Sequence, residues 1–400
     1  MRALQFNISI PRYIILKMLG AINKDVYYKG AVASIKLVEK DKPVPLNGEW
    51  VLIKTKYCGF CGSDLNLIML RDSPMATPFT SFPCIIGHEI YGIVQEGGKT
   101  PFKKGDRVVI SPSLSCSTRG IDPVCHACKI GSVANCENVG EGKFSPGLFT
   151  GICHDINGGF AEYIIAHKSQ VFPVPSQVSD KSAVLTEPFS VGLQAIYDSR
   201  PDDDDHICVI GSGVMGLMII QAIRGLKIKA HITVLEPSEF HAKKAIEYGA
   251  DEIIKGDFLE QSARITHGKV YKPMFGPRVM QGGFDKVYDT VGSSKTFSLA
   301  IGATRVRGTV SIIGIGRHLS FDPTPLWLKL ITVKGTYGYG YVEEDGKTEH
   351  IFNIALELLK QHPKIEDMVT HVFSIDQYQE MIKVNLEKGK NRAIKTIVEF

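Results

Sequence analysis

A glycine pattern between a strand and a helix marks the middle of the 400-residue chain. Residues 207–216 read Ile-Cys-Val-Ile-Gly-Ser-Gly-Val-Met-Gly, so G-x-G-x-x-G follows an apolar run and opens a helical pattern. There the first glycine permits a tight turn, the second lets the backbone approach a pyrophosphate, and the third allows close packing of helix and strand. The helix N-terminus adds free N–H groups for phosphate. The pattern predicts a dinucleotide site at Gly211, Gly213, Val214, Met215 and Gly216.

The next predicted strand, 231–235, ends at Glu236, about 20 residues after the last of these glycines. A carboxylate at this place accepts hydrogen bonds from the ribose hydroxyls and repels a 2′-phosphate, which favours NAD over NADP. The alternative is a glycine turn without a ligand and a glutamate that only faces water. Strands and helices alternate from about 190 to 335, as expected of a parallel sheet built from right-handed βαβ units.

The predicted elements fall into two groups. Within 190–335 we also expect strands at 284–289 and 309–313, helices at 214–226 and 241–248, and a polar surface insertion at 258–282. The earlier part has short β-rich runs between Gly and Pro turns, typical of an antiparallel or barrel-like domain, at 51–56, 90–96, 107–110 and 160–165. A long helix is predicted at 351–361. We therefore predict an α/β chain with one domain formed by 1–189 and 336–400 and another by 190–335.

Charge and hydropathy exclude several classes of protein. The 46 basic and 42 acidic side chains give a net charge of +4, which provides no electrostatic footprint for nucleic acid or an anionic membrane. The most apolar N-terminal segment, 13–22, is short, carries Lys17 and lacks a small-residue cleavage site, so it is neither a membrane span nor a signal peptide. We expect a soluble cytoplasmic protein.

Most of the nine cysteines lie between Cys58 and Cys153. In a long chain without a signal peptide, clustered cysteines are more often metal ligands or catalytic groups than disulfides. One candidate set is Cys61, His88 and Glu187, which are remote in sequence and are hypothesised to converge in space. Three protein ligands with one open position are the pattern of catalytic zinc. The alternative for His88 is a core histidine.

A second set comprises Cys116, Cys125, Cys128 and Cys136, four thiols that can close the tetrahedral cage of a structural zinc. Asp122 is an alternative to Cys116 as the first ligand, and reduced buried thiols are the alternative to any metal. The Cys58-x-x-Cys61 motif also permits a redox pair. Because it follows a strand in the β-rich half, we favour Cys61 as a ligand and Cys58 as a packed thiol. The remaining cysteines are expected to be small core residues: Cys84, Cys153 and Cys208.

The motifs occur in a characteristic order: Cys-Gly-Ser-Asp (61–64), Gly-His-Glu (87–89), the four-cysteine lobe, Gly-Gly-Phe-Ala-Glu-Tyr (158–163), Glu-Pro-Phe-Ser-Val-Gly (187–192) and G-x-G-x-x-G. Further matches follow at 284–292, 308–316 and 331–337. From about Val51 to Phe400 this order resembles the zinc-containing medium-chain alcohol dehydrogenases. The version at 187–192 is most similar to the sorbitol and polyol dehydrogenase branch.

The resemblance implies a β-rich GroES-like catalytic domain and a doubly wound, Rossmann-type coenzyme domain. It assigns the catalytic zinc to Cys61, His88 and Glu187, with Glu89 beside it as an alternate carboxylate and Asp64 orienting His88. The four-cysteine lobe would hold a structural zinc. Val191 would back the nicotinamide, Val291 the adenine, and the backbone around Ile313 and Ile315 the carboxamide. A homo-oligomer, dimer or tetramer, is implied in the same way.

Three features depart from the family. Asn66 replaces a histidine that relays protons, six extra residues separate Cys116 from Cys125, and the 50 N-terminal residues are longer than usual. We expect zinc to lower the pKa of a substrate hydroxyl, Ser63 to take its proton, and hydride to pass to the nicotinamide in a cleft between the domains. A secondary alcohol or polyol is the favoured substrate. The alternatives are an aldose oxidised at its anomeric carbon and, from another class, a zinc-free NAD-binding regulator or quinone-reductase-like protein.

Overall fold

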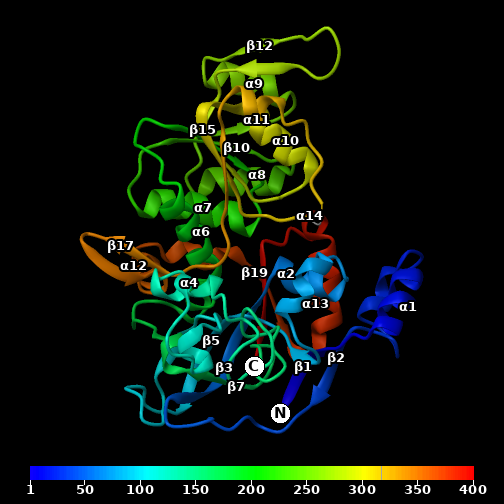
Figure 1. The fold of residues 1–400 in the computed structure, drawn as a ribbon, viewed down its shortest axis with the longest axis vertical. Helices are drawn as coiled ribbons and strands as arrows, with labels where there is room; N and C mark the ends of the chain where they lie inside the picture. The colour runs from blue at the N-terminus through cyan, green and yellow to red at the C-terminus, as the bar shows by residue number, and fades with distance from the viewer. Residues whose placement is uncertain (317) are drawn as a thin grey trace. The chain divides into compact units, whose positions relative to one another are not determined.

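The computed structural model describes residues 1–316 and 318–400 and divides into two compact units (Figure 1). One unit consists of 1–187 and 338–400, and the other of 188–337. These limits lie two residues from the expected domain boundaries. The first unit is therefore discontinuous, since the second is inserted between two of its parts.

The inserted unit contains a six-stranded sheet in which every neighbouring pair is parallel. Its strands, in spatial order, are β11 (Glu252–Ile254), β10 (His231–Leu235), β9 (His206–Ile210), β14 (Phe284–Asp289), β15 (Thr304–Ile312) and β16 (Thr332–Gly335). The order reverses between β9 and β14, where a doubly wound sheet places its ligand. The helices along this unit are α6 (Thr186–Asp198), α7 (Val214–Gly225), α8 (Glu239–Glu247), α9 (Phe258–Ile265), α10 (Ser294–Ala303) and α11 (Thr324–Leu328).

Local sequence accounts for where these elements begin and end. Ser238 accepts a hydrogen bond from the His241 N–H, so α8 begins at Glu239, two residues before the expected start. Gly249, which follows α8, has a φ of 109°, a conformation that side chains disfavour. The strand expected at 309–313 begins five residues earlier, because β15 continues through an irregularity in its pairing with β14.

The expected surface insertion at 258–282 is only partly that. Its first segment is α9, whose Phe258 is 6% exposed and packs in the hydrophobic core of the sheet. The rest forms a short antiparallel hairpin of β12 (Lys269–Tyr271) and β13 (Val279–Gln281). The polar composition of 258–282 did not predict this partly buried helix, because only one side of α9 is apolar.

The discontinuous unit is built on a seven-stranded, mostly antiparallel sheet. In it β3 (Trp50–Phe60) pairs with β5 (Glu89–Glu96) on one side, and with β7 (Tyr163–His167) and then β20 (Lys395–Glu399) on the other. The remaining strands are β6 (Arg107–Ile110), β8 (Val171–Pro173) and β19 (Val369–Ser374). Helix α12 spans Ile351–Gln361, as the sequence predicts, after a hairpin of β17 (Tyr341–Glu344) and β18 (Lys347–His350).

The 50 N-terminal residues form a small subdomain of this unit. Strand β1 (Arg2–Phe6) lies between β2 (Ile35–Glu39) and β4 (Cys84–Ile85), and helix α1 (Ile10–Gly20) connects the first two. Leu16 of α1 is fully buried in the hydrophobic core of the unit. The N-terminal segment is thus folded against the catalytic β-rich half.

No helix in the two described stretches of the chain combines the length and the apolarity that crossing a bilayer requires.

Candidate functional site

Two strands, β3 and β5, bring the first candidate metal ligands to one place. Strand β3 ends at Phe60, directly before Cys61, and β5 begins at Glu89, directly after His88. These ends are adjacent because Gly59 of β3 pairs with Glu89 of β5. The thiol of Cys61, a ring nitrogen of His88 and a carboxylate oxygen of Glu89 all lie within 4.8 Å of one another.

Helix α2 (Gly62–Ile68) holds Cys61 in position from the other side. Cys61 is its N-cap, and the Cys61 N–H donates to Asp64 Oδ2 at 2.9 Å. The other oxygen, Asp64 Oδ1, lies 3.6 Å from His88 Nδ1, and both side chains are buried. The ring of His88 also meets that of Phe149 edge-on at 5.0 Å. Asp64 therefore binds the backbone of Cys61 and lies beside the ring of His88, the residue that the resemblance expects it to orient.

Glu187 lies outside this close group but faces it. It is 8% exposed, and burial raises the pKa of its carboxyl to about 7, with His88 lowering and Glu89 raising it. Tyr339 gives it a hydrogen bond. The structure thus brings Glu89, rather than Glu187, nearest to Cys61 and His88, with Glu187 as a second buried carboxyl beside them.

The buried polar atoms of this group fit a divalent metal ion. Within the described residues, Glu89 Oε2 is buried and has no hydrogen-bond partner. An imidazole, a thiolate and carboxylates are the donor set that zinc prefers. An unpaired buried carboxylate oxygen is unfavourable unless a cation or a donor satisfies it. The donor set and the unpaired carboxylate oxygen therefore support the prediction of a metal centre at these residues.

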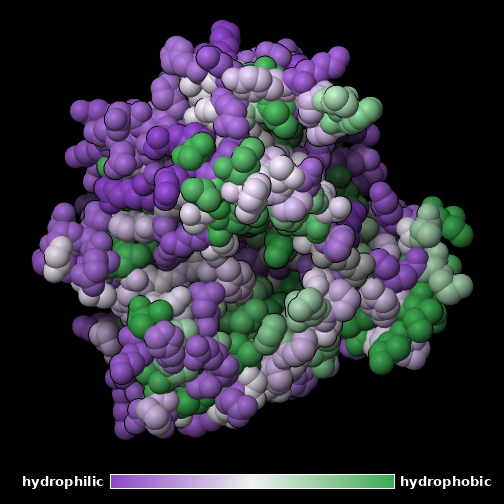
Figure 2. Space-filling view, turned by 45° about the horizontal axis from the view of Figure 1, so that its top comes forward, coloured by the Kyte–Doolittle hydropathy of each residue, from purple (hydrophilic) through white to green (hydrophobic). Residues whose placement is uncertain are grey.

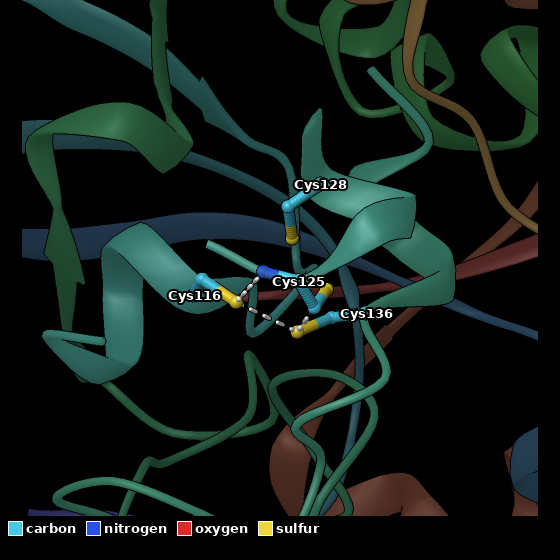
Figure 3. Close-up of side chains that lie close together, drawn as sticks. All are labelled: Cys116, Cys125, Cys128 and Cys136. Carbon is cyan, nitrogen blue, oxygen red and sulfur yellow. Dashed lines mark hydrogen bonds between the residues drawn. The ribbon is translucent and has the colours of Figure 1, made fainter. Parts of the chain in front are cut away.

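The second set gathers in a surface lobe (Figure 3). Cys116 begins the short helix α3 (Cys116–Arg119), Cys125 caps α4 (His126–Lys129), Cys128 lies on α4, and Cys136 follows. The Cys136 Sγ lies 3.6 Å from Cys116 Sγ and 3.9 Å from Cys125 Sγ. A tetrahedral zinc with Zn–S bonds of ~2.3 Å separates its sulfurs by about 3.8 Å, so the spacing fits.

Cys116, rather than Asp122, completes this four-sulfur group. Asp122 is not among the residues that gather there. The Cys116 Sγ accepts hydrogen bonds from the Cys125 N–H at 3.3 Å and from Asn138 Nδ2 at 3.4 Å, as a thiolate would. Partial burial opposes ionisation of Cys125, but hydrogen bonds from backbone N–H groups lower the pKa of its thiol to about 7. Thiolates are the form that binds zinc.

The six extra residues of the lobe contribute a buried cation. Arg119 is 0% exposed and donates only to backbone carbonyl oxygens, including those of Glu141 and Phe144 at 3.0 Å and Gly147 at 2.7 Å. Burial lowers the pKa of this guanidinium, while Cys153, Cys136, Asp155 and Cys116 act in the opposite direction. None of its hydrogen-bond acceptors in the described chain is a carboxylate.

The other cysteines behave as packed thiols. Cys58 is 0% exposed within the core, and burial raises the pKa of its thiol well above the usual value. The position of the Cys58-x-x-Cys61 motif does not by itself exclude a redox pair, because Cys61 caps a helix. The buried, protonated Cys58 is the better reason, since thiol exchange needs a thiolate. The expectation for the rest is confirmed, because Cys84, Cys153 and Cys208 are all at most 1% exposed.

The glycine pattern forms the predicted turn between β9 and α7. Gly211 has a φ of 87°, and a Cβ on Gly216 would lie 2.0 Å from the Gly211 carbonyl oxygen, so both positions need glycine. A Cβ on Gly213 would meet nothing within 4 Å. Gly213 caps α7 without a side-chain hydrogen bond, and Val214 and Met215 open the helix. This leaves an uncapped helix N-terminus beside open space, which suits a pyrophosphate.

Glu236 lies at the end of β10, where the sequence predicts it. It is 8% exposed, with Oε2 accepting from the Ser212 N–H at 2.9 Å and Oε1 from the Ser238 N–H at 2.8 Å. Since Ser212 belongs to the glycine turn, the carboxylate is held against the turn. The alternative, a glutamate that merely faces water, is excluded by its burial.

The remaining predicted cofactor residues lie on the same unit. Val291 follows β14 and is 49% exposed, and its γ-methyl lies 2.8 Å from where a Cβ on Gly211 would be. Ile313 follows β15, and its N–H donates to the Asp289 carbonyl at 3.0 Å. Ile315 is 83% exposed, and Val191 lies on α6, half-buried. Gly211, Val291 and Ile313 therefore lie in loops that follow three adjacent strands, β9, β14 and β15, at their carboxyl ends.

Sequence reasoning missed three residues of these sites: Lys395, Tyr339 and Arg119. Lys395 forms an ion pair with Glu89 and donates to the Phe60 carbonyl at 3.3 Å. Its only sequence signal is a lysine at the start of an apolar strand near the C-terminus. Arg119 has the better signal, because it lies in the unusual spacing between the first two lobe cysteines.

Comparison with known proteins agrees with both sites. Residues 47–176 match the alcohol dehydrogenase GroES-like domain, and residues 214–360 match the zinc-binding dehydrogenase family. Sorbitol dehydrogenase of Bacillus subtilis is 29% identical over 89% of this chain and 92% of its own length. The starvation-sensing protein RspB of Escherichia coli is 30% identical over 54% of this chain and 58% of its own length.

A solved structure shares the fold over nearly the same extent. The crystal structure of 2R,3R-butanediol dehydrogenase from Bacillus subtilis superposes with a TM-score of 0.70 at 26% identity, covering 92% of this chain and 96% of that one. The two family matches fall on the two halves of the chain, and the relatives extend across both. The chain belongs to the zinc-containing medium-chain alcohol dehydrogenases, a family of NAD(P)-dependent oxidoreductases, and is most similar to their polyol branch.

Proposed function

We propose that this chain is a zinc-dependent dehydrogenase that transfers hydride between a secondary alcohol or polyol and NAD. The observation that carries the proposal is the convergence of Cys61, His88 and buried carboxylates in a chain that also carries the glycine turn. Burying a thiol, an imidazole and two carboxyls together is unfavourable unless other charges satisfy them, and Lys395 pairs with only one of these groups, Glu89.

Cys61, His88 and Glu187 would hold the catalytic zinc, with Glu89 as the neighbouring carboxylate that can replace one of them. The four lobe cysteines would hold a second, structural zinc. When bound, the catalytic zinc supplies Lewis acidity that lowers the pKa of a substrate hydroxyl toward neutrality. Ser63, the exposed second residue of α2, would accept the hydroxyl proton. Asn66 cannot titrate, so water or the ribose hydroxyls would carry that proton outward.

The substrate class comes from the relatives. Sorbitol and 2,3-butanediol, named in the matched proteins, both carry a secondary hydroxyl beside another hydroxyl. A vicinal diol is therefore our first choice, and an aldose at its anomeric carbon is the competing one. The burial of Glu236 and its place against the turn support NAD over NADP. The nine unpaired cysteines support a cytoplasmic, reducing site of action.

An open sheet edge supports a homo-oligomer. Strand β16 is the last strand of its sheet and is exposed along its length. Large apolar side chains surround it, with Trp327 75%, Leu328 57% and Leu330 57% exposed. An exposed edge with apolar neighbours favours pairing with another chain. We expect a dimer formed through β16, which light scattering would reveal and a Leu330→Lys substitution would weaken.

The deciding experiment joins metal analysis to a substrate screen. The purified protein is analysed for zinc and then offered alcohols, diols, polyols and aldoses with NAD or NADP, monitored at the nicotinamide absorbance. We expect about two zinc ions per chain and highest kcat/KM with vicinal diols and NAD. Glu236→Gln, which removes the charge and keeps the shape, should raise the relative use of NADP by about 10-fold or more. Absence of zinc would refute the proposal. Activity confined to aldoses would replace the alcohol or polyol with an aldose as the substrate.

A further inference from the structure

Helix α1 leaves half of its circumference unpartnered. Its buried side consists of Leu16, with Tyr13 and Lys17 half-buried beside it, packed on the core of the discontinuous unit. On the opposite side, positions spaced by about one turn are all large and aliphatic. They are Ile10, Ile14, Ile15, Met18 and Leu19, exposed by 80%, 53%, 44%, 69% and 42% respectively, and Ile22, which is 90% exposed, follows just after the helix. Figure 2 shows hydrophobic side chains gathered at its right-hand edge, over α1.

This apolar face of α1 is larger than a folded chain usually shows to water. Six such side chains present on the order of 500 Å², at the upper end of the apolar patches found on monomers, and such patches mark interaction sites. Two copies meeting through this face alone would bury on the order of 1,000 Å², which is below the size of most stable specific interfaces.

The charges around the face also select the partner. Residues 1–24 contain four cationic side chains, Arg2, Arg12, Lys17 and Lys24, and no acidic residue. Arg2 is paired with Glu162 and Asp376, but the three others make no salt bridge in the described structure, although Arg12 donates to the Asn7 carbonyl and Lys17 to the Leu70 carbonyl. Pairing two copies of α1 would therefore bring like charges together, which is unfavourable. An anionic surface would be attracted instead.

We propose that α1 docks this protein peripherally on anionic lipid bilayers, with its aliphatic face in the headgroup region. A short helix with one wholly apolar side and cationic edges suits the interface plane, where it lies on a membrane without crossing it. Each lysine or arginine near such a surface contributes about 1 kcal/mol of attraction. The near-neutral whole-chain charge does not oppose this, because the attraction acts within about a Debye length of α1.

The test is co-sedimentation of the full chain with vesicles. Vesicles of phosphatidylcholine alone are compared with vesicles that also contain phosphatidylglycerol. We expect binding to the anionic vesicles that weakens with salt and falls by about 10-fold or more in Ile14→Asp/Met18→Asp. The control is Val44→Asp, an equally exposed apolar position outside α1, which should bind normally. Arg12→Gln/Lys24→Gln should weaken binding to anionic vesicles while the apolar face stays intact.

Two results would overturn the proposal. One is the absence of vesicle binding by a folded protein. The other is a solution dimer that Ile14→Asp/Met18→Asp dissociates without any effect on vesicles, which would assign α1 to a second copy. Unchanged melting temperatures of the variants show that they fold. The result is independent of the proposed dehydrogenase activity, which these exposed substitutions should leave intact.

Discussion

Lys395 and Glu89 form an ion pair in which each side chain is only 1% exposed. Glu89 begins β5, Lys395 begins β20, and both strands pair with β3 just before Cys61. The pair occupies Glu89 Oε1 and leaves Oε2, which lies against Gly59, without a hydrogen-bond partner in the described structure. Lys395 therefore determines which oxygen of Glu89 is available.

Removing Lys395 should destabilise the folded chain. In Lys395→Met, Glu89 becomes an unpaired buried carboxylate, which should lower the free energy of unfolding by about 3–5 kcal/mol. Lys395→Arg keeps the charge and should recover most of the loss. Urea unfolding of the three proteins measures the effect. Equal stabilities would show that the carboxylate is already satisfied by another group.

Substitutions at two glycines of the turn should separate a loss of nucleotide binding from a loss of folding stability. Gly213→Ala adds a methyl group to open space, so stability should be unchanged while NADH binding weakens by about 10-fold or more. Gly216→Ala places its Cβ 2.0 Å from the Gly211 oxygen and should destabilise the unit itself. Fluorescence titration with NADH and a thermal melt distinguish the two. Tight NADH binding by Gly213→Ala would mean that no pyrophosphate approaches the turn.

Metal analysis can identify the first ligand of the lobe. Cys116→Ser should lower the zinc content from about two ions per chain to about one, because it opens a four-ligand cage. Asp122→Asn should retain both ions, since Asp122 lies outside the sulfur group. Elemental analysis of the two variants decides the matter. The opposite pattern would restore the aspartate as the ligand.

Arg119 should control how firmly the lobe holds its metal. Arg119→Met removes a buried cation and leaves the carbonyls of Glu141, Phe144 and Gly147 without their donor. Zinc release to a chromogenic chelator should become about 10-fold faster or more, as found when groups that support metal ligands are removed. The rate of zinc release from Arg119→Lys should lie between the rates of the parent protein and of Arg119→Met. Release at the parental rate in a folded Arg119→Met protein would contradict the role.

His350 should make stability depend on pH. Burial lowers the pKa of its imidazole to about 3, whereas the unfolded value is about 6.5. Between these values the unfolded chain binds the extra proton, so stability is full above pH 6.5 and decreases as the pH falls toward 3. At pH 5 this amounts to about 2 kcal/mol relative to neutral pH.

The variant His350→Phe isolates that contribution. It keeps an aromatic ring beside Phe172, which lies 4.6 Å from the histidine ring, but cannot titrate. Its stability relative to the parent should therefore improve as the pH falls from 7 to 5, measured by urea unfolding at each pH. A constant difference would show that His350 takes up its proton equally in the folded and unfolded chains, so that burial does not lower its pKa.

Much of this molecule follows from local sequence. The strand–glycine–helix segment and Glu236 could be predicted because neighbouring residues determine the turn and the sheet order determines where the acid emerges. The four cysteines were predictable for the same reason, since their spacing alone limits them to one lobe. The limits of α8 were missed by two residues because Ser238, a cap outside the apolar pattern, determines its start.

Contacts between remote segments could not be predicted. The resemblance gives Glu89 only as an alternate carboxylate to Glu187, whereas the pairing of Gly59 with Glu89 brings Glu89 closest to Cys61, and no sequence pattern reports that register. Lys395 reaches Glu89 across a pairing of β20 with β3 that joins residues more than 300 positions apart. Arg119 resembles a surface arginine in sequence, and only the surrounding carbonyls show that it is buried.

The inserted arrangement of the chain has a consequence for its synthesis. Strand β20 pairs with the second half of β3, but it is synthesised after the whole inserted unit. Residues 188–337 can fold as soon as they emerge from the ribosome, while that half of β3 still lacks a partner on one side. A nascent chain that has not yet reached β20 should therefore contain a folded unit 188–337 and an incomplete seven-stranded sheet, and chaperones would bind at the unpaired part of β3.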